Sequence, residues 1–126
     1  MSATVLVVDD NEDNVRIVTM FLLARGYQIR IARDGPSALE SVRQARPDVI
    51  LLDVMMPGMD GLQVLDHLKL DPKTASIPVV MMTAKTQDED VLAGYQGGAD
   101  YYITKPFTTR QILHAIGLVL GSHARA

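Results

Sequence analysis

The 126-residue chain contains no cysteine and no tryptophan, and aromatic residues make up only 5% of it. Without cysteine, disulfide bonds, thiolate metal sites and cysteine nucleophiles are excluded, and a reducing compartment is favoured. The net charge is only −3, and the sequence shows no cluster of Lys and Arg. Direct binding to nucleic acid or to an anionic membrane is therefore not predicted, because both require concentrated positive charge.

Long apolar runs and a secretory leader are also missing. No apolar stretch approaches the ~18 residues of a membrane span, and residues 1–4 lack the basic and apolar regions of a signal peptide. We therefore expect a cytoplasmic protein. Hydrophobic residues form 48% of the chain and charged residues 21%, which is typical of a globular protein. The length suits one domain, 1–126, with a frayed tail at 121–126.

The hydrophobic pattern predicts five strands that alternate with five helices. Apolar runs bounded by turn residues indicate buried strands, and the alternating residues 28–32 suit a strand nearer an edge. Apolar residues at helical spacing fill the intervals. The predicted strands are 5–8, 28–32, 49–52, 77–82 and 101–104. The predicted helices follow Asn11 and Asp34 and then cover 62–70, 88–96 and 108–120.

This alternation predicts an α/β fold, a doubly wound (βα)5 unit whose five-stranded parallel sheet carries helices on both faces. Alternation alone does not fix the order of the strands. Small sheets of this kind most often take the flavodoxin-like order 2-1-3-4-5, and ligands then bind beyond the carboxyl ends of strands 1 and 3. Asp9, Asp10 and Asp53 follow those two strands.

The three carboxylates at these strand ends point to a cation. At ~5 Å, carboxylates repel by roughly 3 kcal/mol per pair at an effective dielectric constant of 20, so such a cluster needs a counter-ion. Oxygen ligands without His or Cys select a hard ion such as Mg²⁺, which also accepts phosphate oxygens. Asp53, on the central strand, is the candidate nucleophile toward a phosphoryl group.

Two further strand ends carry groups that suit phosphoryl transfer, which depends mostly on positioning and charge neutralisation. Lys105 would pair with one phosphoryl oxygen. The Thr83 hydroxyl and the Ala84 backbone amide would donate hydrogen bonds to another.

These residues resemble the receiver domain of response regulators in two-component signal transduction, of the chemotaxis-regulator type. The resemblance covers nearly the whole chain. It rests on four motifs in order, which are Val7-Val8-Asp9-Asp10, the run from Asp53 to Gly61 with its Pro57-Gly58 turn, Met82-Thr83-Ala84 and Lys105-Pro106-Phe107.

The resemblance implies a role for each matched position. Asp53 would be the phosphoacceptor. The ligands of Mg²⁺, or of Mn²⁺ in its place, would be Asp9, Asp10, Asp53 and the Met55 backbone carbonyl. The phosphoryl group would contact Thr83, the Ala84 amide and Lys105, with the Lys105-Pro106 bond in the cis form. Thr83 and Tyr102 would form the conformational switch.

The implied function is a phosphorylation-activated signalling switch. It would accept a phosphoryl group from a histidine kinase or phosphotransfer protein onto Asp53 in a Mg²⁺-dependent reaction. The surface of helix 4, strand 5 and helix 5 would then change shape and be read by a downstream effector domain or protein. Such a protein dephosphorylates itself and is not a turnover enzyme.

Two other functions fit parts of the sequence. A Mg²⁺-dependent phosphatase with an aspartyl-phosphate intermediate would need a general acid two residues after Asp53, where Met55 stands. A flavodoxin-type cofactor binder is disfavoured, because carboxylates occupy the place of a phosphate-binding loop. Tyr101 and Gln111 replace acidic residues of receivers coupled to DNA-binding domains, so the salt-bridged dimer of those proteins is not expected.

Overall fold

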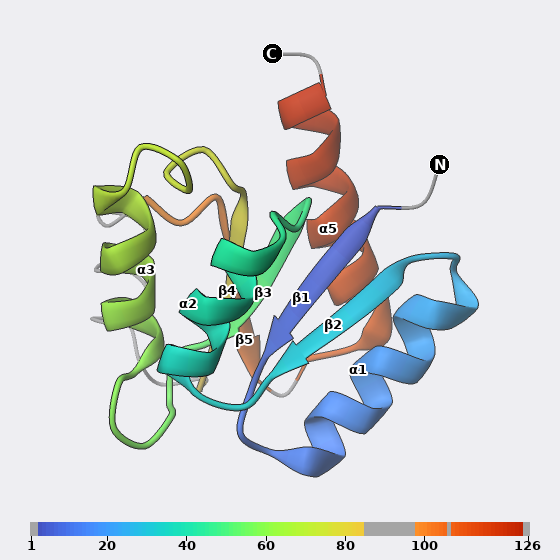
Figure 1. The fold of residues 1–126 in the computed structure, drawn as a ribbon. Coiled ribbons are helices and arrows are strands. Elements are labelled where there is room, and N and C mark those ends of the chain that lie inside the picture. Colours follow the sequence, from blue (N-terminus) through green and yellow to red (C-terminus); the bar gives the residue numbers. More distant parts are fainter. Residues whose placement is uncertain (1–2, 85–97, 106, 125–126) are drawn as a thin grey trace.

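The structure, a computed structural model, describes residues 3–84, 98–105 and 107–124, and of residues 84, 105 and 122–124 the backbone alone. Five parallel strands form one sheet in the order β2-β1-β3-β4-β5 (Figure 1), which confirms the predicted fold class and strand order. β2 is an edge strand, as its alternating pattern predicts. The elements are β1 (Thr4–Val8), α1 (Glu12–Ala24), β2 (Gln28–Ala32), α2 (Gly35–Gln44), β3 (Val49–Asp53), α3 (Gly61–Leu70), β4 (Val79–Ala84), β5 (Tyr101–Lys105) and α5 (Thr109–Ala124).

The sheet separates two hydrophobic cores. α2 and α3 cover one face, and α1 and α5 cover the other (Figure 1). Successive residues of a strand point to opposite faces, so Leu6 and Val8 of β1 join the core under α2 and α3, while Val5 and Val7 join the core under α1 and α5. This explains why residues 5–8 of β1 and residues 49–52 of β3 are apolar at every position.

Side chains at the strand-to-helix turns fix where the first three helices begin. Asn11 and Asp34 accept hydrogen bonds from backbone amides in the first turns of α1 and α2. The bond from the Ser37 amide, 2.7 Å long, lowers the pKa of the exposed Asp34 carboxyl below its ordinary value. Asp60 and Gln63 form a reciprocal capping box at α3. These caps place each helix start at the carboxyl edge of the sheet.

Two elements, β4 and α5, differ from the sequence prediction by two residues or more at an end. β4 begins at Val79 rather than at residue 77 and continues to Ala84. Pro78 has no amide hydrogen to donate to the sheet, and only its carbonyl takes part by accepting from Ile50. α5 continues to Ala124, beyond the predicted end at residue 120, because an exposed Gly121 does not stop a helix by itself. Whether its last turn frays stays a prediction.

The helix predicted at 88–96 lies outside the described residues. Across the ranges that are described, every helix is too short or too polar to span a bilayer.

Replacing Asp60 with alanine should lower the free energy of unfolding by about 1 kcal/mol, because the first turn of α3 loses a capping side chain. Urea denaturation measures this change. The matched control is Asp66→Ala, which removes the same charge from an exposed position within α3. We expect the control to change stability by less than ~0.5 kcal/mol, and equal losses in both variants would contradict the capping role.

Candidate functional site

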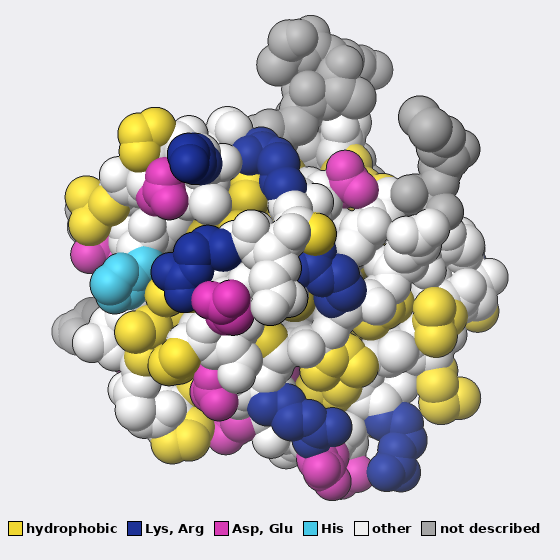
Figure 2. Space-filling view, viewed as in Figure 1, with side chains coloured by type: hydrophobic (Ala, Val, Ile, Leu, Met, Phe, Trp, Pro, Cys, Tyr) yellow, Lys and Arg dark blue, Asp and Glu magenta, His cyan; other side chains and the backbone are white. Residues whose placement is uncertain are grey.

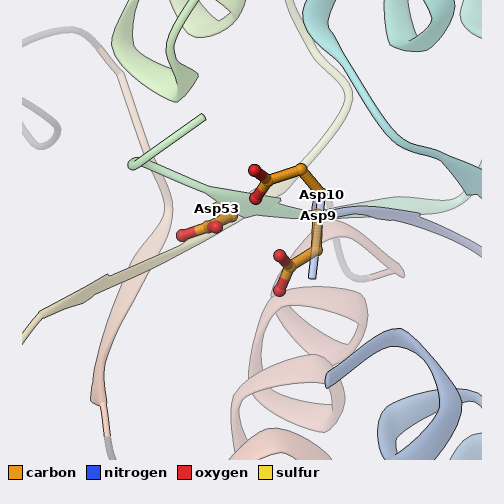
Figure 3. A group of neighbouring side chains, drawn as sticks. All are labelled: Asp9, Asp10 and Asp53. Carbon is orange, nitrogen blue, oxygen red and sulfur yellow. The ribbon is translucent and has the colours of Figure 1, made fainter. Parts of the chain in front are cut away.

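Three carboxylates meet at the carboxyl edge of the sheet (Figure 3). Asp9 and Asp10 follow β1, and Asp53 ends the neighbouring strand β3, whose register pairs Leu52 with Val8. One carboxylate oxygen from each residue lies within 4.8 Å of the others. Asp9 and Asp53 are 1% and 2% exposed, whereas Asp10 is exposed to solvent. The structure thus brings together the three acids that the sequence places at these strand ends.

Backbone amides and one side chain orient the two buried acids. The Asn11 amide donates to Asp9 Oδ1 at 3.0 Å, and Asn14 Nδ2 lies 3.5 Å from Asp9 Oδ2. The Met55 amide donates to Asp53 Oδ1 at 3.3 Å. These bonds restrict the rotation of the two carboxylates.

The donor set fits a small hard cation. Three carboxylates supply only oxygen, which suits Mg²⁺ or Mn²⁺ and does not suit metals that prefer nitrogen or sulfur. The exposed Asp10 keeps one side of the group open to solvent, so that water could complete the coordination of an ion. A divalent ion at this position would offset the mutual repulsion of the three negative charges.

Thr83 adds a buried hydroxyl to the same edge of the sheet. It follows Met82, which pairs with Asp53 in the register of β3 and β4. Thr83 is 0% exposed, and its Oγ1 makes no hydrogen bond with any residue that the structure describes. A buried hydroxyl without a partner is costly, so this group is available to a ligand oxygen.

The adjacent strand β5 brings the other predicted residues to this region. The backbone of Lys105 pairs with Ala84, so the two strands end side by side. The side chain of Lys105 and the peptide to Pro106 lie outside the described part of the chain, and the predicted inward direction of the lysine stays a prediction.

Tyr102 is half-buried on the same side of the sheet as Thr83. It packs against the core that contains Met81, its register partner in β4, and Thr83 is the second residue after Met81. A hollow of about 150 Å³ borders this tyrosine; its lining residues are Tyr101, Tyr102, Ile103, Thr104, Gln111 and His114.

Gln111 has a local structural role. Its side chain accepts from the Thr108 amide at 2.7 Å, and the Gln111 amide donates to Thr108 Oγ1 at 3.1 Å. This reciprocal pair caps α5. The Gln111 side chain is therefore already bonded at the start of its own helix.

Sequence reasoning assigned no site role to Asn11 and Asn14. The Asn11 amide reaches Asp9 because an aspartate commonly accepts from the backbone two residues ahead, which the Asp-Asp-Asn order could have indicated. Asn14 lies one helical turn beyond Asn11, on the side of α1 nearest Asp9. No spacing in the sequence alone distinguishes it from an ordinary polar residue of the helix.

Away from the site, charges of both signs are mixed. Figure 2 shows the side of the molecule that carries β2, α1, α2 and α3, where Lys and Arg alternate with Asp, Glu and hydrophobic side chains. Positive charge does not form a continuous area on this face.

Comparison with known proteins identifies the same fold and motifs. The family model of the response regulator receiver domain matches residues 5–117. Response regulator PleD of Caulobacter vibrioides is 51% identical over 106 residues, which are 84% of this chain and 23% of that protein. DNA-binding response regulator MtrA of Mycobacterium tuberculosis is 42% identical over 113 residues, covering 90% of this chain and 48% of that protein.

Solved structures agree with these matches. The chemotaxis response regulator CheY4 of Vibrio cholerae superimposes with a TM-score of 0.88 at 33% identity, over 94% of this chain and 99% of that one. The signal receiver domain of a histidine kinase from Syntrophus aciditrophicus superimposes with a TM-score of 0.91 at 31% identity. The match covers 99% of this chain and 95% of that one. This chain spans about a quarter to a half of the curated relatives it matches. By its family match, its relatives and its fold, the chain belongs to the response regulator receiver domain family.

Proposed function

We propose that this chain is a phosphorylation-activated switch in which Asp53 accepts a phosphoryl group in a Mg²⁺-dependent reaction. The observation that carries the proposal is the meeting of three carboxylates at the ends of β1 and β3, with oxygens within 4.8 Å, beside the buried Thr83 near the end of β4. Membership of the receiver family supports the same function.

In the proposed reaction, an Asp53 carboxylate oxygen attacks the phosphorus of a phosphohistidine donor. The phosphorus–nitrogen bond breaks, and its electron pair returns to the imidazole nitrogen, which then takes a proton. The hydrogen bond from the Met55 amide to Oδ1 restricts the direction of the attacking carboxylate. A bound Mg²⁺ would supply charge neutralisation for the transferred group.

Asp9, Asp10, Asp53 and the Met55 backbone carbonyl are the proposed ligands of the ion. The hydrogen bonds that Asp9 accepts from Asn11 and Asn14 support this assignment, because they orient its carboxylate toward the cluster. Thr83, the Ala84 amide and Lys105 are the proposed contacts of the phosphoryl oxygens. The buried Thr83 hydroxyl, which has no partner among the described residues, supports its part in this set.

The switch is proposed to pass from Thr83 to Tyr102. Phosphorylation adds nearly two negative charges, which attract the hydroxyl and the lysine toward Asp53. Because Tyr102 lies on the same side of the sheet as Thr83, this movement vacates space into which the aromatic ring can turn. The altered surface beside β5 and α5 would then be read by a downstream effector domain or protein.

The proposed donor is a histidine kinase or phosphotransfer protein, and the phosphate is then lost by the protein's own hydrolysis. A phosphatase that turns over a separate substrate is less well supported, because Met55, two residues after Asp53, offers no general acid. The cytoplasmic location and the single-domain boundaries 1–126 stay predictions of the sequence.

The central test is to add Mg²⁺ with acetyl phosphate or beryllofluoride and to follow intact mass and amide NMR spectra. With acetyl phosphate the wild type should gain the mass of one phosphoryl group, and with either reagent the amides of β4 and β5 should shift. Asp53→Ala should lose both responses, and Thr83→Ala should weaken them. The matched control is Asp48→Ala, which removes a carboxylate at the opposite end of β3; an unchanged response in Asp53→Ala would contradict the assignment.

Removing one of the clustered charges should stabilise the metal-free protein. Asp10→Asn is expected to raise the free energy of unfolding by about 1–2 kcal/mol without metal, because like charges within 4.8 Å repel and Asp10 is partly screened by solvent. The same variant should lose most of the ~1.4 kcal/mol that Mg²⁺ at ten times its dissociation constant gives the wild type.

Urea denaturation with and without Mg²⁺ measures both effects. Asp13→Asn, an exposed residue in the first turn of α1, is the control, and it should lose a little stability because its charge favours the helix N-terminus. A loss of stability in metal-free Asp10→Asn would contradict the proposed repulsion.

A further inference from the structure

We propose that Gly61, the first residue of α3, is a positioning residue for the phosphoacceptor. The absence of a side chain at this position lets α3 start directly against the backbone of Asp53. This inference rests on the proposed function, and it adds a residue that contacts neither the phosphoryl group nor a metal ion.

The contact is between backbones. A Cβ added to Gly61 would lie 2.3 Å from the Asp53 carbonyl oxygen, 2.8 Å from Val54 Cα and 2.9 Å from the Asp53 carbonyl carbon. Ordinary van der Waals contact begins at about 3.4 Å, so the two segments would have to separate by roughly 1 Å. All three neighbours belong to the peptide that leaves Asp53.

The backbone angles at Gly61 do not themselves require glycine. The glycines with positive φ in the described ranges are Gly26, Gly58 and Gly98. Alanine is also a better helix former than glycine, so helix propensity alone predicts that alanine at position 61 would be favourable. The close approach to Asp53 is the feature of the structure that opposes it.

Neither side of this contact can move freely. On the α3 side, the Gly61 amide donates to the Val54 carbonyl at 2.9 Å, the Asp60 and Gln63 capping box holds the first turn, and Leu65 is buried in the core. On the other side, the Val54 amide donates to the Met82 carbonyl at 2.9 Å, which extends the pairing of β3 with β4 by one residue.

Strain from an added methyl group would therefore fall on the peptide between Asp53 and Val54. The Asp53 side chain leaves the chain at the adjoining Cα, so a shift of this peptide displaces its carboxylate relative to Asp9 and Asp10. It also disturbs the hydrogen bond from the Met55 amide to Oδ1. Displacements of this size at a reacting group can lower rates by about 100-fold.

The test compares glycine-to-alanine variants of the whole chain. Gly61→Ala should lower the rate constant for phosphorylation by acetyl phosphate at least ~10-fold and weaken Mg²⁺ binding several-fold. Intact mass and isothermal titration calorimetry measure the two quantities. Gly117→Ala is the matched control, because this exposed residue of α5 has no atom within 4 Å of an added Cβ and should match the wild type.

The rate constant for phosphorylation of Gly35→Ala is expected to lie between those of Gly61→Ala and Gly117→Ala. The nearest atoms to the Cβ added at Gly35 would be Cβ and Sδ of Met59, both at 2.8 Å, and a shift of Met59 would reach Asp53 only through the loop between them. The loss of phosphorylation rate should be largest in Gly61→Ala, smaller in Gly35→Ala and absent in Gly117→Ala.

A variant of equal stability separates positioning from loss of fold. Val119→Ala removes volume from the core under α5, away from the site. Val119→Ala and Gly61→Ala are compared at temperatures at which the same fraction of each is folded. A rate constant for phosphorylation that falls in Gly61→Ala and not in Val119→Ala supports the positioning role of Gly61. An equal fall in both, or a Gly61→Ala rate within twofold of wild type, overturns it.

If Gly61→Ala does not fold, Gln63→Ala loosens the same first turn while Gly61 is retained. Its phosphorylation rate should then fall about threefold, and an unchanged rate would overturn the inference. A wild type that shows no response to Mg²⁺ and acetyl phosphate would instead contradict the proposed function itself.

Discussion

The mutual repulsion of Asp9, Asp10 and Asp53 is the constraint around which this structure is arranged. Each side chain extends from the end of a parallel strand, and the sheet holds two of them away from water with oxygens within 4.8 Å. Such an arrangement stores unfavourable electrostatic energy in the metal-free state. A bound divalent ion would relieve this repulsion, which is why the cluster supports the proposed metal site.

The fold tolerates this repulsion because the residues directly before the acids are apolar and buried, which stabilises the strands that carry them. The residues that precede the acids, Val8 and Leu52, are fully buried and lie side by side in the sheet. The close approach of α3 at Gly61 and the capping box at Asp60 then fix the loop beyond Asp53. Stability is thus concentrated in the strands, and the polar groups at their ends are positioned without contributing much of it themselves.

Most of the fold was predictable because buried parallel strands have a simple sequence signature. Their positions are apolar on both faces, and turn residues mark their ends, so the order of elements and the edge position of residues 28–32 followed. The start of β4 was misplaced, because Ile77 and Pro78 continue the apolar run while proline cannot donate to the sheet. The end of α5 was placed too early, because Gly121 resembles a helix-ending glycine although the helix continues through it to Ala124.

The proximity of the three acids was also predictable, because parallel strands bring their carboxyl ends to one edge. The contribution of Asn14 and the close contact at Gly61 were not, because both depend on how a helix approaches a strand end in three dimensions. Residue chemistry alone predicted that Thr83 and Lys105 contact phosphoryl oxygens, and the family resemblance added the switch role of Thr83 and Tyr102.

The division of the interior by the sheet has an evolutionary consequence. Among the described residues, the side chains under α2 and α3 and those under α1 and α5 form separate clusters on opposite faces of the sheet. Substitutions in one layer can accumulate without repacking the other. Recognition surfaces on opposite sides of the molecule can therefore diverge independently among paralogues while the chemistry between them is kept.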